Sequence, residues 1–455
     1  MTDPRVFAAV DIGASGGRVA AGLVEDGVVS LDLVHRFPNG AVETGGHLRW
    51  DLTRILDEVG MGLDRLAASY PQVESIGIDT WAVDYGLLDA DEKLLADPVA
   101  YRDDRTAEVI DAVHALVPPD ELYAINGLQF LPFTTLYQLA AEQLGPLWAD
   151  AAHVVFLPDL VAHRLSGELR TERTLASTTG LLDVRTGDWS SDLLDRLRIP
   201  ASRLPPIEEP GTVRGAGPHG TVVTTVASHD TASAVVGVPA TSERFAYVAC
   251  GTWSLVGLEL AAPVLTSEAR ELNFTNEGGV DGRTRFLRNV GGLWLLQESM
   301  RDWRRDDLTA LLAEAATLPP GPLVDVDDPA FIPPGGMPER IARAADRPSM
   351  TPGETVRCIV ESLASAYART VDQAARLAGV TVDVIHIVGG GSQNELLCQL
   401  TADAAERPVV AGPVEATALG NVVVQARAHG ALPQSLEAIR AGIAASSPLR
   451  RFDPR

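Results

Sequence analysis

The chain has 455 residues, a formal net charge of −24 and 46% hydrophobic residues, a composition typical of a globular enzyme. This length exceeds what one hydrophobic core organises, so we expect two large domains. Such an acidic surface repels nucleic acid and anionic membranes, and we expect neither as a partner. The three cysteines have no disulfide or metal spacing, and no pattern of a signal peptide or membrane span is found, which indicates a reducing cytoplasm.

Lysine is almost absent from the chain. Lys93 is the only one, and it lies in a hydrophilic turn. This excludes the lysine of a P-loop ATPase, the strand lysine of a protein kinase and a Schiff-base lysine. If the protein handles ATP, the phosphates are held by backbone amides, hydroxyl groups, arginine and a metal ion.

The first element is a glycine-rich turn between two strands. Residues 11–18 (DIGASGGR) follow an apolar run at 6–10 and lead into a second run at 19–24. Glycines let the backbone reverse sharply and approach a bulky anion. A P-loop or a dinucleotide-binding turn would be followed by a helix. Here alternating and β-branched residues follow, and they predict a β-hairpin.

Helices and strands alternate in the following part of the chain. A helix is predicted over 51–68, where apolar residues recur with the spacing of one buried face. Strands are predicted at 74–79 and 84–89, and residues 104–200 are predicted to be mostly helical. Strands linked by helical crossovers indicate an α/β fold.

Polar residues surround the ends of these strands. Residues 79–84 (DTWAVD) place Trp81 between carboxylates and a hydroxyl group, which suits either core packing or the wall of a sugar pocket. Residues 101–106 (YRDDRT) suit either a solvated turn or a binding segment. The residues alone leave both alternatives open.

A strand predicted at 222–226 leads into 228–231 (SHDT). An aspartate in this position either caps the following helix or acts as a base. The carboxyl end of a strand is where open α/β sheets bind ligands, which favours the second role for Asp230. The run 215–220 matches G-x-G-x-x-G literally, but it precedes a strand and contains a proline, so we predict a loop there.

The second half of the chain, from about residue 239, repeats the glycine-rich turn. Residues 250–254 (CGTWS) follow a predicted strand at 245–249 and lead into another at 255–260. Helices are predicted near 292–304 and 353–378. Between them, residues 319–352 are rich in proline and glycine and predict an irregular surface insertion.

Three consecutive glycines, 389–391, lie between a predicted strand at 383–388 and a predicted helix at 395–405. Such a turn permits close approach by a flat ring or a phosphate. Together with the two hairpins, about half the chain apart, it favours two related domains that bind one polyphosphate.

Taken together, six segments resemble the FGGY family of carbohydrate kinases, in order and over nearly the whole chain. Within that family, 79–84 and 101–106 are similar to the branch that phosphorylates L-rhamnulose. The glycine-rich turns are less specific, because actin-like ATPases share them. The six segments are 11–18, 77–84, 99–106, 228–231, 251–254 and 389–394.

The resemblance implies an α/β fold of two actin-like (ribonuclease H-like) domains, 1–238 and 239–455, with an inter-domain catalytic cleft. It implies ATP and Mg²⁺ as cofactors, transfer of the γ-phosphoryl group to O1 of L-rhamnulose, and Asp230 as general base. Asp11 would orient Mg²⁺ through water, since Mg²⁺ sheds its waters reluctantly. We expect a monomer or a homodimer.

The expected site residues fall into two sets. Those expected to contact the nucleotide are Asp11, Gly13, Ala14, Ser15, Gly16, Gly17, Arg18, Gly251, Thr252, Gln297, Gly390, Gly391 and Asn394. Those expected to contact the sugar are Asp79, Trp81, Ala82, His229, Asp230, Thr231 and Asn289.

One departure from the family bears on the substrate. The family usually has glycine where this chain has Ala82, and that position approaches the sugar. Kinases of L-fuculose, D-xylulose or glycerol are therefore alternatives. An actin- or Hsp70-like ATPase would need neither a sugar pocket nor a base at Asp230. The presence of Asp230 and of both phosphate turns also argues against a non-catalytic sugar-binding regulator.

Overall fold

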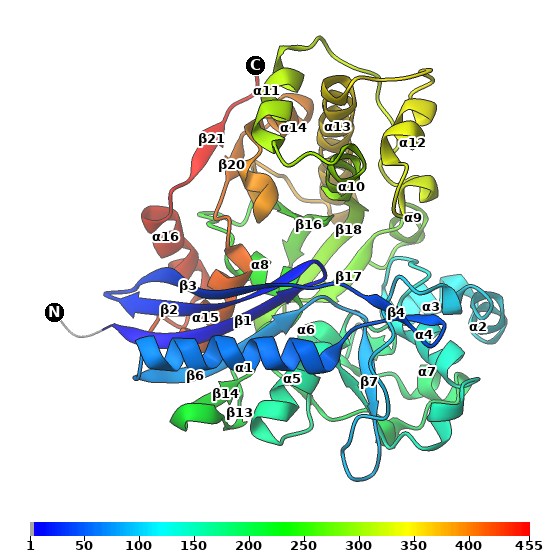
Figure 1. The fold of residues 1–455 in the computed structure, drawn as a ribbon, viewed down its shortest axis with the longest axis vertical. Coiled ribbons are helices and arrows are strands. Elements are labelled where there is room, and N and C mark those ends of the chain that lie inside the picture. Colours follow the sequence, from blue (N-terminus) through cyan, green and yellow to red (C-terminus); the bar gives the residue numbers. More distant parts are fainter. Residues whose placement is uncertain (1–3) are drawn as a thin grey trace. The chain divides into compact units, whose positions relative to one another are not determined.

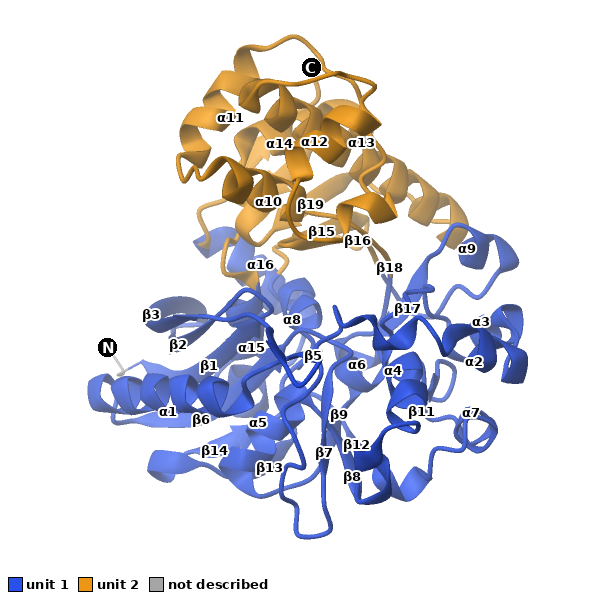
Figure 2. Cartoon of the chain, turned by 45° about the vertical axis from the view of Figure 1, so that its right-hand side comes forward, with its two compact units in different colours: residues 1–237, 259–286, 417–446 blue, residues 238–258, 287–416, 447–455 orange. Residues whose placement is uncertain are grey.

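The computed structural model describes residues 4–455 (Figure 1). The chain forms two compact units, coloured separately in Figure 2. The first unit runs to Gly237 and also takes in 259–286 and 417–446, and the second unit consists of 238–258, 287–416 and 447–455. The units are therefore not continuous in sequence, and a domain boundary after residue 238 stays a prediction.

The first unit is built on a mixed sheet of six strands. Its central strand β1 runs antiparallel to β2 and parallel to β6, so the predicted hairpin at the N-terminal end is confirmed. In sheet order the strands are β13 (Val213–Ala216), β14 (Val222–Thr224), β6 (Val73–Thr80), β1 (Arg5–Gly13), β2 (Gly16–Glu25) and β3 (Val28–Pro38).

Successive side chains of β1 point to opposite faces of this sheet, and both faces are buried. Val6, Ala8 and Val10 belong to one apolar core, and Phe7 and Ala9 belong to another on the opposite face. Residues of two helices enter the first core, α1 (Leu52–Ser69) and α5 (Leu157–Ser166). Residues of three other helices enter the second core: α8 (Asp230–Val236), α15 (Ala416–Ala428) and α16 (Leu436–Ser446).

The predicted helical region 104–200 contains short helices and a few short strands. The literal glycine pattern at 215–220 lies between antiparallel strands β13 and β14, as predicted. The other elements of the first unit are β4 (Val42–Thr44), β5 (His47–Arg49), β7 (Tyr85–Leu88), α2 (Ile110–Leu116), α3 (Pro119–Asn126), α4 (Thr135–Glu142), β8 (His153–Phe156), β9 (Thr171–Glu172), α6 (Arg173–Ala176), β10 (Leu182–Asp183), β11 (Asp188–Trp189), α7 (Ser191–Arg196), β12 (Ile207–Glu208) and α9 (Ser267–Glu271).

A second mixed sheet has seven strands. β15 runs antiparallel to β16 and parallel to β19, which repeats the local pattern of β1, β2 and β6. In sheet order the strands are β17 (Thr275–Gly278), β18 (Thr284–Gly291), β16 (Trp253–Leu260), β15 (Phe245–Cys250), β19 (Val384–Val388), β20 (Val409–Ala411) and β21 (Arg450–Phe452).

Capping residues set both ends of α13 (Pro352–Ala378), the long helix of the second unit. Thr351 and Glu354 form a reciprocal capping box around Pro352 in the first turn, and Gly379 ends the helix with φ +66°. The helices of this unit are α10 (Trp294–Trp303), α11 (Leu308–Thr317), α12 (Met337–Ala344), α13 (Pro352–Ala378) and α14 (Glu395–Ala405). The prediction that 319–352 is irregular was wrong in part, because α12 lies within it.

No helix among residues 4–455 is both long and apolar enough to cross a membrane. Cys250, Cys358 and Cys398 are free and buried.

Candidate functional site

The first glycine-rich turn is a tight hairpin. Gly13 pairs with Gly16, which leaves Ala14 and Ser15 as the connecting residues. A side chain at Gly17 would meet the ring of Phe37, whose Cζ lies 2.2 Å from the position of an added Cβ. Packing therefore requires glycine at this position, while the Ala14–Ser15 tip remains accessible.

Carboxylates lie close together at the ends of β1 and β6. Asp11 and Asp79 are partners in the parallel register of these strands, and Arg18 Nε donates to Asp11 Oδ2 at 2.8 Å. Burial, and then the negative charge of Asp11, raise the pKa of Asp79 well above its usual value, and the charge of Asp230 acts in the same direction. Asn421 Nδ2 donates to Asp79 Oδ2 at 2.6 Å, while Asp79 Oδ1 has no partner among the described residues.

The candidate base Asp230 is the first residue of α8. Its Oδ1 accepts hydrogen bonds from the backbone N–H of Thr231 at 2.5 Å and from Thr231 Oγ1 at 3.1 Å. The side chain is 30% exposed, unlike the buried Asp11 and Asp79. Asp230 is thus oriented by its own helix start and remains accessible to a ligand.

Behind Asp230 lies a buried ion pair that the sequence did not predict. His229 Nε2 is 3.5 Å from Asp230 Oδ1, and His229 Nδ1 is 3.1 Å from Arg285 Nη2. Arg285 also pairs with Glu277 at 3.0 Å. Burial alone would raise the pKa of Glu277, but the Arg285 cation and His229 outweigh it and leave this pKa below its usual value.

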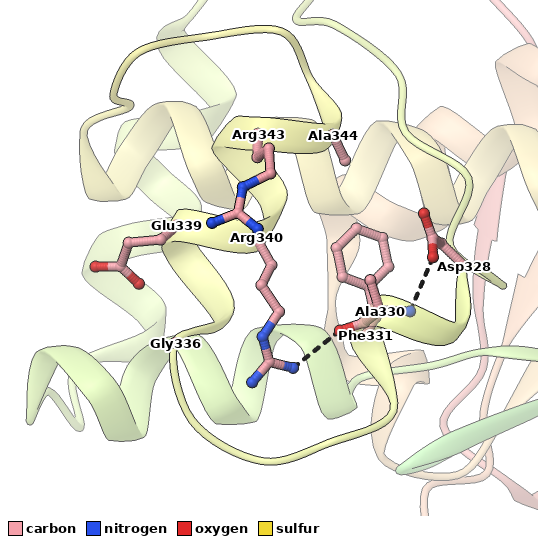
Figure 3. Close-up of a pocket in the computed structure, with 8 residues that line it drawn as sticks. All are labelled: Asp328, Ala330, Phe331, Gly336, Glu339, Arg340, Arg343 and Ala344. Carbon is pink, nitrogen blue, oxygen red and sulfur yellow. Dashed lines mark hydrogen bonds between the residues drawn. The ribbon is translucent and has the colours of Figure 1, made fainter.

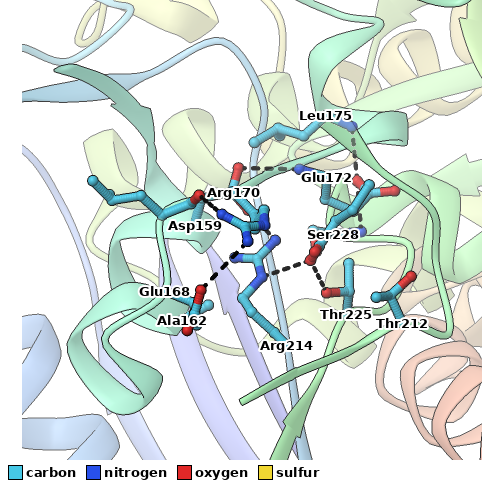
Figure 4. A network of polar contacts seen from close by, with 12 residues as sticks. Asp159, Ala162, Glu168, Arg170, Glu172, Leu175, Thr212, Arg214, Thr225 and Ser228 are labelled. Atoms are coloured by element: carbon cyan, nitrogen blue, oxygen red, sulfur yellow. Dashed lines mark hydrogen bonds and ion pairs between the residues drawn. The ribbon is translucent and has the colours of Figure 1, made fainter. Parts of the chain in front are cut away.

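A second buried network holds the backbone just before Asp230 (Figure 4). Glu172 accepts hydrogen bonds from the backbone N–H of Ser228 at 3.2 Å and of Leu175 at 2.9 Å, and from Thr174 N–H and Oγ1 at 2.7 and 2.6 Å. The hydroxyl of Thr174 in turn accepts from the N–H of His229 at 3.3 Å. Glu172 was not among the predicted site residues, because nothing in its local sequence marks it.

The same network continues away from the candidate base. Arg214 donates to Asp159 Oδ1 at 2.8 Å and to Glu208 Oε1 at 2.6 Å. The backbone N–H of Glu172 donates to Asp159 Oδ2 at 3.4 Å, which connects the two groups. The carboxylates are thereby fixed around a single buried guanidinium.

Buried carboxyl groups of the first unit are expected to make the protein less stable as the pH rises towards neutrality. Burial raises the pKa of Glu172 to about 7, and those of Asp159 and Asp84 to about 6. Between about pH 4 and 7 the folded chain therefore holds protons that the unfolded chain has released, so the free energy of unfolding falls with rising pH. One pKa unit corresponds to about 1.4 kcal/mol.

Urea unfolding at a series of pH values through this window measures the effect. The midpoint is expected to fall steadily, and Glu172→Gln should reduce the slope. A midpoint that rises or stays constant would contradict the expectation.

Residues 79–84 and 101–106 meet around the buried carboxylate of Asp84. Its Oδ2 accepts from Trp50 Nε1 at 2.6 Å, Trp81 Nε1 at 2.9 Å and the N–H of Tyr101 at 3.1 Å. Gln138 Nε2 donates to its other oxygen at 3.1 Å. The indole N–H of Trp81 is thus used within the protein, and its ring packs on Trp50 with the centroids 4.2 Å apart.

Ala82 and Val83 follow this aromatic pair and are only half-buried. Val83 has φ +69°, which is strained for a β-branched residue. Its carbonyl accepts from Thr135 Oγ1 at 2.7 Å and from Gln138 at 3.2 Å, and these bonds hold the unusual backbone. The position of Ala82 is therefore fixed by its neighbours.

In the second unit, the turn at 250–254 is also a hairpin. Cys250 pairs with Ser254, and the N–H of Gly251 donates to the carbonyl of Trp253 at 2.9 Å. Thr252 is half-buried, and its carbonyl accepts from the N–H of Trp294 at 3.1 Å. The turn thus packs on the start of α10, the helix that carries the exposed Gln297.

The triple glycine contacts this same hairpin. An added Cβ at Gly391 would lie 2.1 Å from Cys250 Sγ, whereas one at Gly390 would meet no atom within 4 Å. Gly389 has φ +80°, and the following residues form a short 3₁₀ turn before α14. Asn394 caps α14, because its Oδ1 accepts from the N–H of Leu397 at 3.0 Å. The predicted strand, glycine turn and helix are confirmed.

The predicted site residues form two groups, one on each unit. The first unit carries Asp11, Gly13, Ala14, Ser15, Gly16, Gly17, Arg18, Asp79, Trp81, Ala82, His229, Asp230 and Thr231. The second unit carries Gly251, Thr252, Asn289, Gln297, Gly390, Gly391 and Asn394.

One pocket in the second unit contains none of these residues (Figure 3). It has a volume of about 490 Å³ and is lined by parts of 328–344. Arg340 within it donates to the carbonyls of Ala330 at 2.9 Å and Pro333 at 2.6 Å. Its guanidinium therefore holds the neighbouring loop. Among residues 4–455, no three His, Cys, Asp or Glu side chains are grouped to hold a metal ion.

Comparison with known families agrees with this arrangement of turns and carboxylates. Residues 6–237 match the N-terminal domain of the FGGY family of carbohydrate kinases, and residues 246–429 match its C-terminal domain. The chain belongs to this family and is an ATP-dependent sugar kinase.

Similar curated proteins carry a more specific name. A protein named rhamnulokinase from Pectobacterium carotovorum is 43% identical, with 98% of this chain and 92% of the relative covered. Rhamnulokinases from Enterococcus faecalis and Bacteroides thetaiotaomicron are each 39% identical. The match to the Enterococcus protein covers 98% of this chain and 94% of the relative. The match to the Bacteroides protein covers 99% of this chain and 96% of the relative.

Solved structures share the fold at much lower identity. A gluconate kinase from Lactobacillus acidophilus has a TM-score of 0.79 at 17% identity, covering 99% of this chain and 94% of its own. A glycerol kinase from Plasmodium falciparum, solved with ADP, also has a TM-score of 0.79 at 17% identity, and the match covers 99% of this chain and 94% of that chain. The predicted actin-like fold with two domains is confirmed.

Proposed function

We propose that this kinase transfers the γ-phosphoryl group of ATP to O1 of L-rhamnulose, giving L-rhamnulose 1-phosphate and ADP. The observation that carries the proposal is the similarity to proteins named rhamnulokinase over nearly the full length of the chain. An accessible carboxylate at Asp230, beside His229, supports the same reaction class.

The chemistry requires a base for the sugar hydroxyl. O1 attacks the γ-phosphorus, the bond from that phosphorus to the bridging oxygen of ADP breaks, and Asp230 accepts the proton of O1. His229, Thr231 and Asn289 are the residues we propose to contact the sugar, with Asp79, Trp81 and Ala82 lining its surroundings. Of these, Trp81 would contribute its ring, because its N–H already binds Asp84.

The nucleotide is proposed to bind through the glycine-rich turns. Residues 13–18 and Gly251 would offer backbone amides to the phosphates, and the hydroxyl of Thr252 would face them. Gly390 and Gly391 would allow close approach of the nucleotide, with Gln297 and Asn394 nearby in the same unit. These roles are what membership of the FGGY family implies for these residues.

Mg²⁺ fits the carboxylates of the first unit. Asp79 Oδ1 is a buried oxygen without a hydrogen-bond partner among the described residues. Burial and the charge of Asp11 raise the pKa of Asp79, and Arg18, the cation of this group, is paired with Asp11. Carboxylate oxygens are ligands that Mg²⁺ prefers. We propose that Asp11 holds the ion through water, and that the bound ion neutralises charge on the phosphates.

A substrate panel tests the proposal. ADP release would be measured with L-rhamnulose, L-fuculose, D-xylulose and glycerol. The highest kcat/KM is expected for L-rhamnulose. A higher value for another acceptor would make the protein a kinase of that acceptor. ATP hydrolysis that is independent of every sugar would favour the actin- or Hsp70-like alternative.

Ala82→Gly is expected to keep the enzyme active and to broaden or shift its sugar preference. The methyl group would narrow the surroundings of the sugar beside Trp81, and one methyl group changes discrimination by roughly 1–3 kcal/mol. The measurement is the ratio of kcat/KM for L-rhamnulose over L-fuculose and D-xylulose in both proteins. Equal ratios would mean that Ala82 does not contact the sugar.

Three further properties belong to the proposal. We infer a reducing cytoplasmic location from the cysteines, which lack the spacing of a disulfide framework. The protein would act as a monomer or a homodimer, without nucleic acid or membrane partners. The sequence boundary between the two domains would lie near residue 238.

A further inference from the structure

We propose that Arg285 is a positioning residue that fixes the tautomer of His229 and thereby orients the candidate base Asp230. The inference rests on the proposed role of Asp230 and extends it to a residue 55 positions further along the chain. It concerns only side chains of the first unit.

Arg285 lies in β18 with its side chain completely buried. Its Nε donates to the carbonyl of Gly278 at 2.8 Å, and its Nη2 lies 3.0 Å from Glu277 Oε2. The same Nη2 lies 3.1 Å from His229 Nδ1. The guanidinium plane is therefore held by two groups of the neighbouring strand while it faces the imidazole.

An arginine can only donate hydrogen bonds. A bond from Arg285 to His229 Nδ1 requires that this nitrogen carry no proton. The proton of the neutral imidazole then lies on Nε2, which faces Asp230 Oδ1 at 3.5 Å. Glu277 competes for the opposite tautomer, because its Oε2 lies 3.4 Å from Nδ1. Arg285 is closer to Nδ1 and also neutralises the charge of Glu277.

The tautomer of His229 decides which carboxylate oxygen of Asp230 faces the sugar hydroxyl. With its proton on Nε2, His229 places the positive end of an N–H dipole near Oδ1 of Asp230, 3.5 Å from Nε2, and the same oxygen also accepts from Thr231. The other carboxylate oxygen is then the one left to face the sugar hydroxyl. With the proton on Nδ1, His229 would turn a lone pair towards the carboxylate and repel it. A displacement of a catalytic group by about 1 Å costs on the order of 100-fold in rate.

The direct test is the tautomer of His229 in protein labelled with ¹⁵N-histidine. Long-range ¹H–¹⁵N spectra at mildly alkaline pH distinguish a protonated from a bare ring nitrogen, and His229→Gln assigns the signal. The wild type is expected to show a bare Nδ1 and a protonated Nε2. In Arg285→Met the proton is expected to move to Nδ1, because the carboxylate of Glu277 then remains beside this nitrogen as an acceptor.

Kinetics of the same variants test the consequence. Arg285→Met should lower kcat by about tenfold to 100-fold with a much smaller change in KM for ATP. Arg440→Met is the matched control, because Arg440 is also a buried arginine, paired with Glu259 at 2.6 Å and bound to the carbonyl of Val235 in α8. This control should lose stability but retain the wild-type tautomer and kcat.

A protonated Nδ1 in the wild type would overturn the proposal, and this measurement uses a variant, His229→Gln, only to assign the signal. A moved proton with unchanged kcat would overturn the positioning role. If Asp230→Asn retained its turnover, the base assignment would fail, while the spectra would still report whether Arg285 sets the tautomer. The two proposals therefore fail separately.

Discussion

Asp230→Asn is expected to abolish phosphoryl transfer almost completely while ATP still binds. Loss of a general base costs about 10²–10⁴-fold in turnover. The variant keeps an amide oxygen that can accept from Thr231, so the start of α8 should remain folded. It cannot take the proton of the sugar hydroxyl, because an amide oxygen is a far weaker base than a carboxylate.

Three measurements separate this effect from misfolding. ADP release gives the turnover, titration calorimetry gives ATP affinity, and thermal unfolding gives stability. Asp91→Asn, which removes an equal charge from an exposed turn, is the control and should behave like the wild type. Turnover above about a tenth of the wild-type value would exclude Asp230 as the base.

The hairpins and the strand ends were predictable from sequence because their causes are local. Alternating residues on either side of 11–18 and 250–254 specify two antiparallel strands, and the structure has them. A helix predicted over 395–405 coincides with α14, whose start is set by the cap at Asn394. In each case neighbouring residues in the chain contain the whole signal.

The supports of the candidate site were not predictable, because distant segments provide them. Asn421 binds Asp79 across 342 positions of sequence, and Glu172 binds the backbone of Ser228 across 56. Arg285 and Glu277 approach His229 from another pair of strands. The strand 284–291 (TRFLRNVG) carries two arginines, and nothing in its local sequence marks Arg285 as the buried one.

For Trp81 the sequence leaves two roles open, and the structure supplies evidence for one of them. The residues 79–84 suited either core packing or a sugar pocket. The structure gives the ring a tilted aromatic partner in Trp50 and the N–H an acceptor in Asp84. Packing therefore accounts for the indole, and a sugar contact by Trp81 stays a prediction that concerns the ring edge and the adjacent Ala82.

The glycine turn of the second unit offers the other large expected effect. Gly391→Ala is expected to destabilise the protein strongly, because the new Cβ would lie 2.1 Å from Cys250 Sγ and 2.5 Å from Cys250 Cβ. Overpacking of this kind costs about 1–3 kcal/mol or more. Since Cys250 begins the hairpin that carries Thr252, the displacement should also impair nucleotide binding.

Gly390→Ala is the matched variant, because an added Cβ there has no atom within 4 Å. It should unfold at the wild-type temperature and yet bind ATP at least about tenfold more weakly, a difference of about 1.4 kcal/mol, if the nucleotide lies against this turn. Thermal unfolding and calorimetric titration with ATP measure both effects. Cys250→Gly combined with Gly391→Ala should recover part of the lost stability, since it removes the two clashing atoms. Wild-type ATP affinity in Gly390→Ala would place the nucleotide elsewhere, and wild-type stability in Gly391→Ala would show that the hairpin yields to the methyl group.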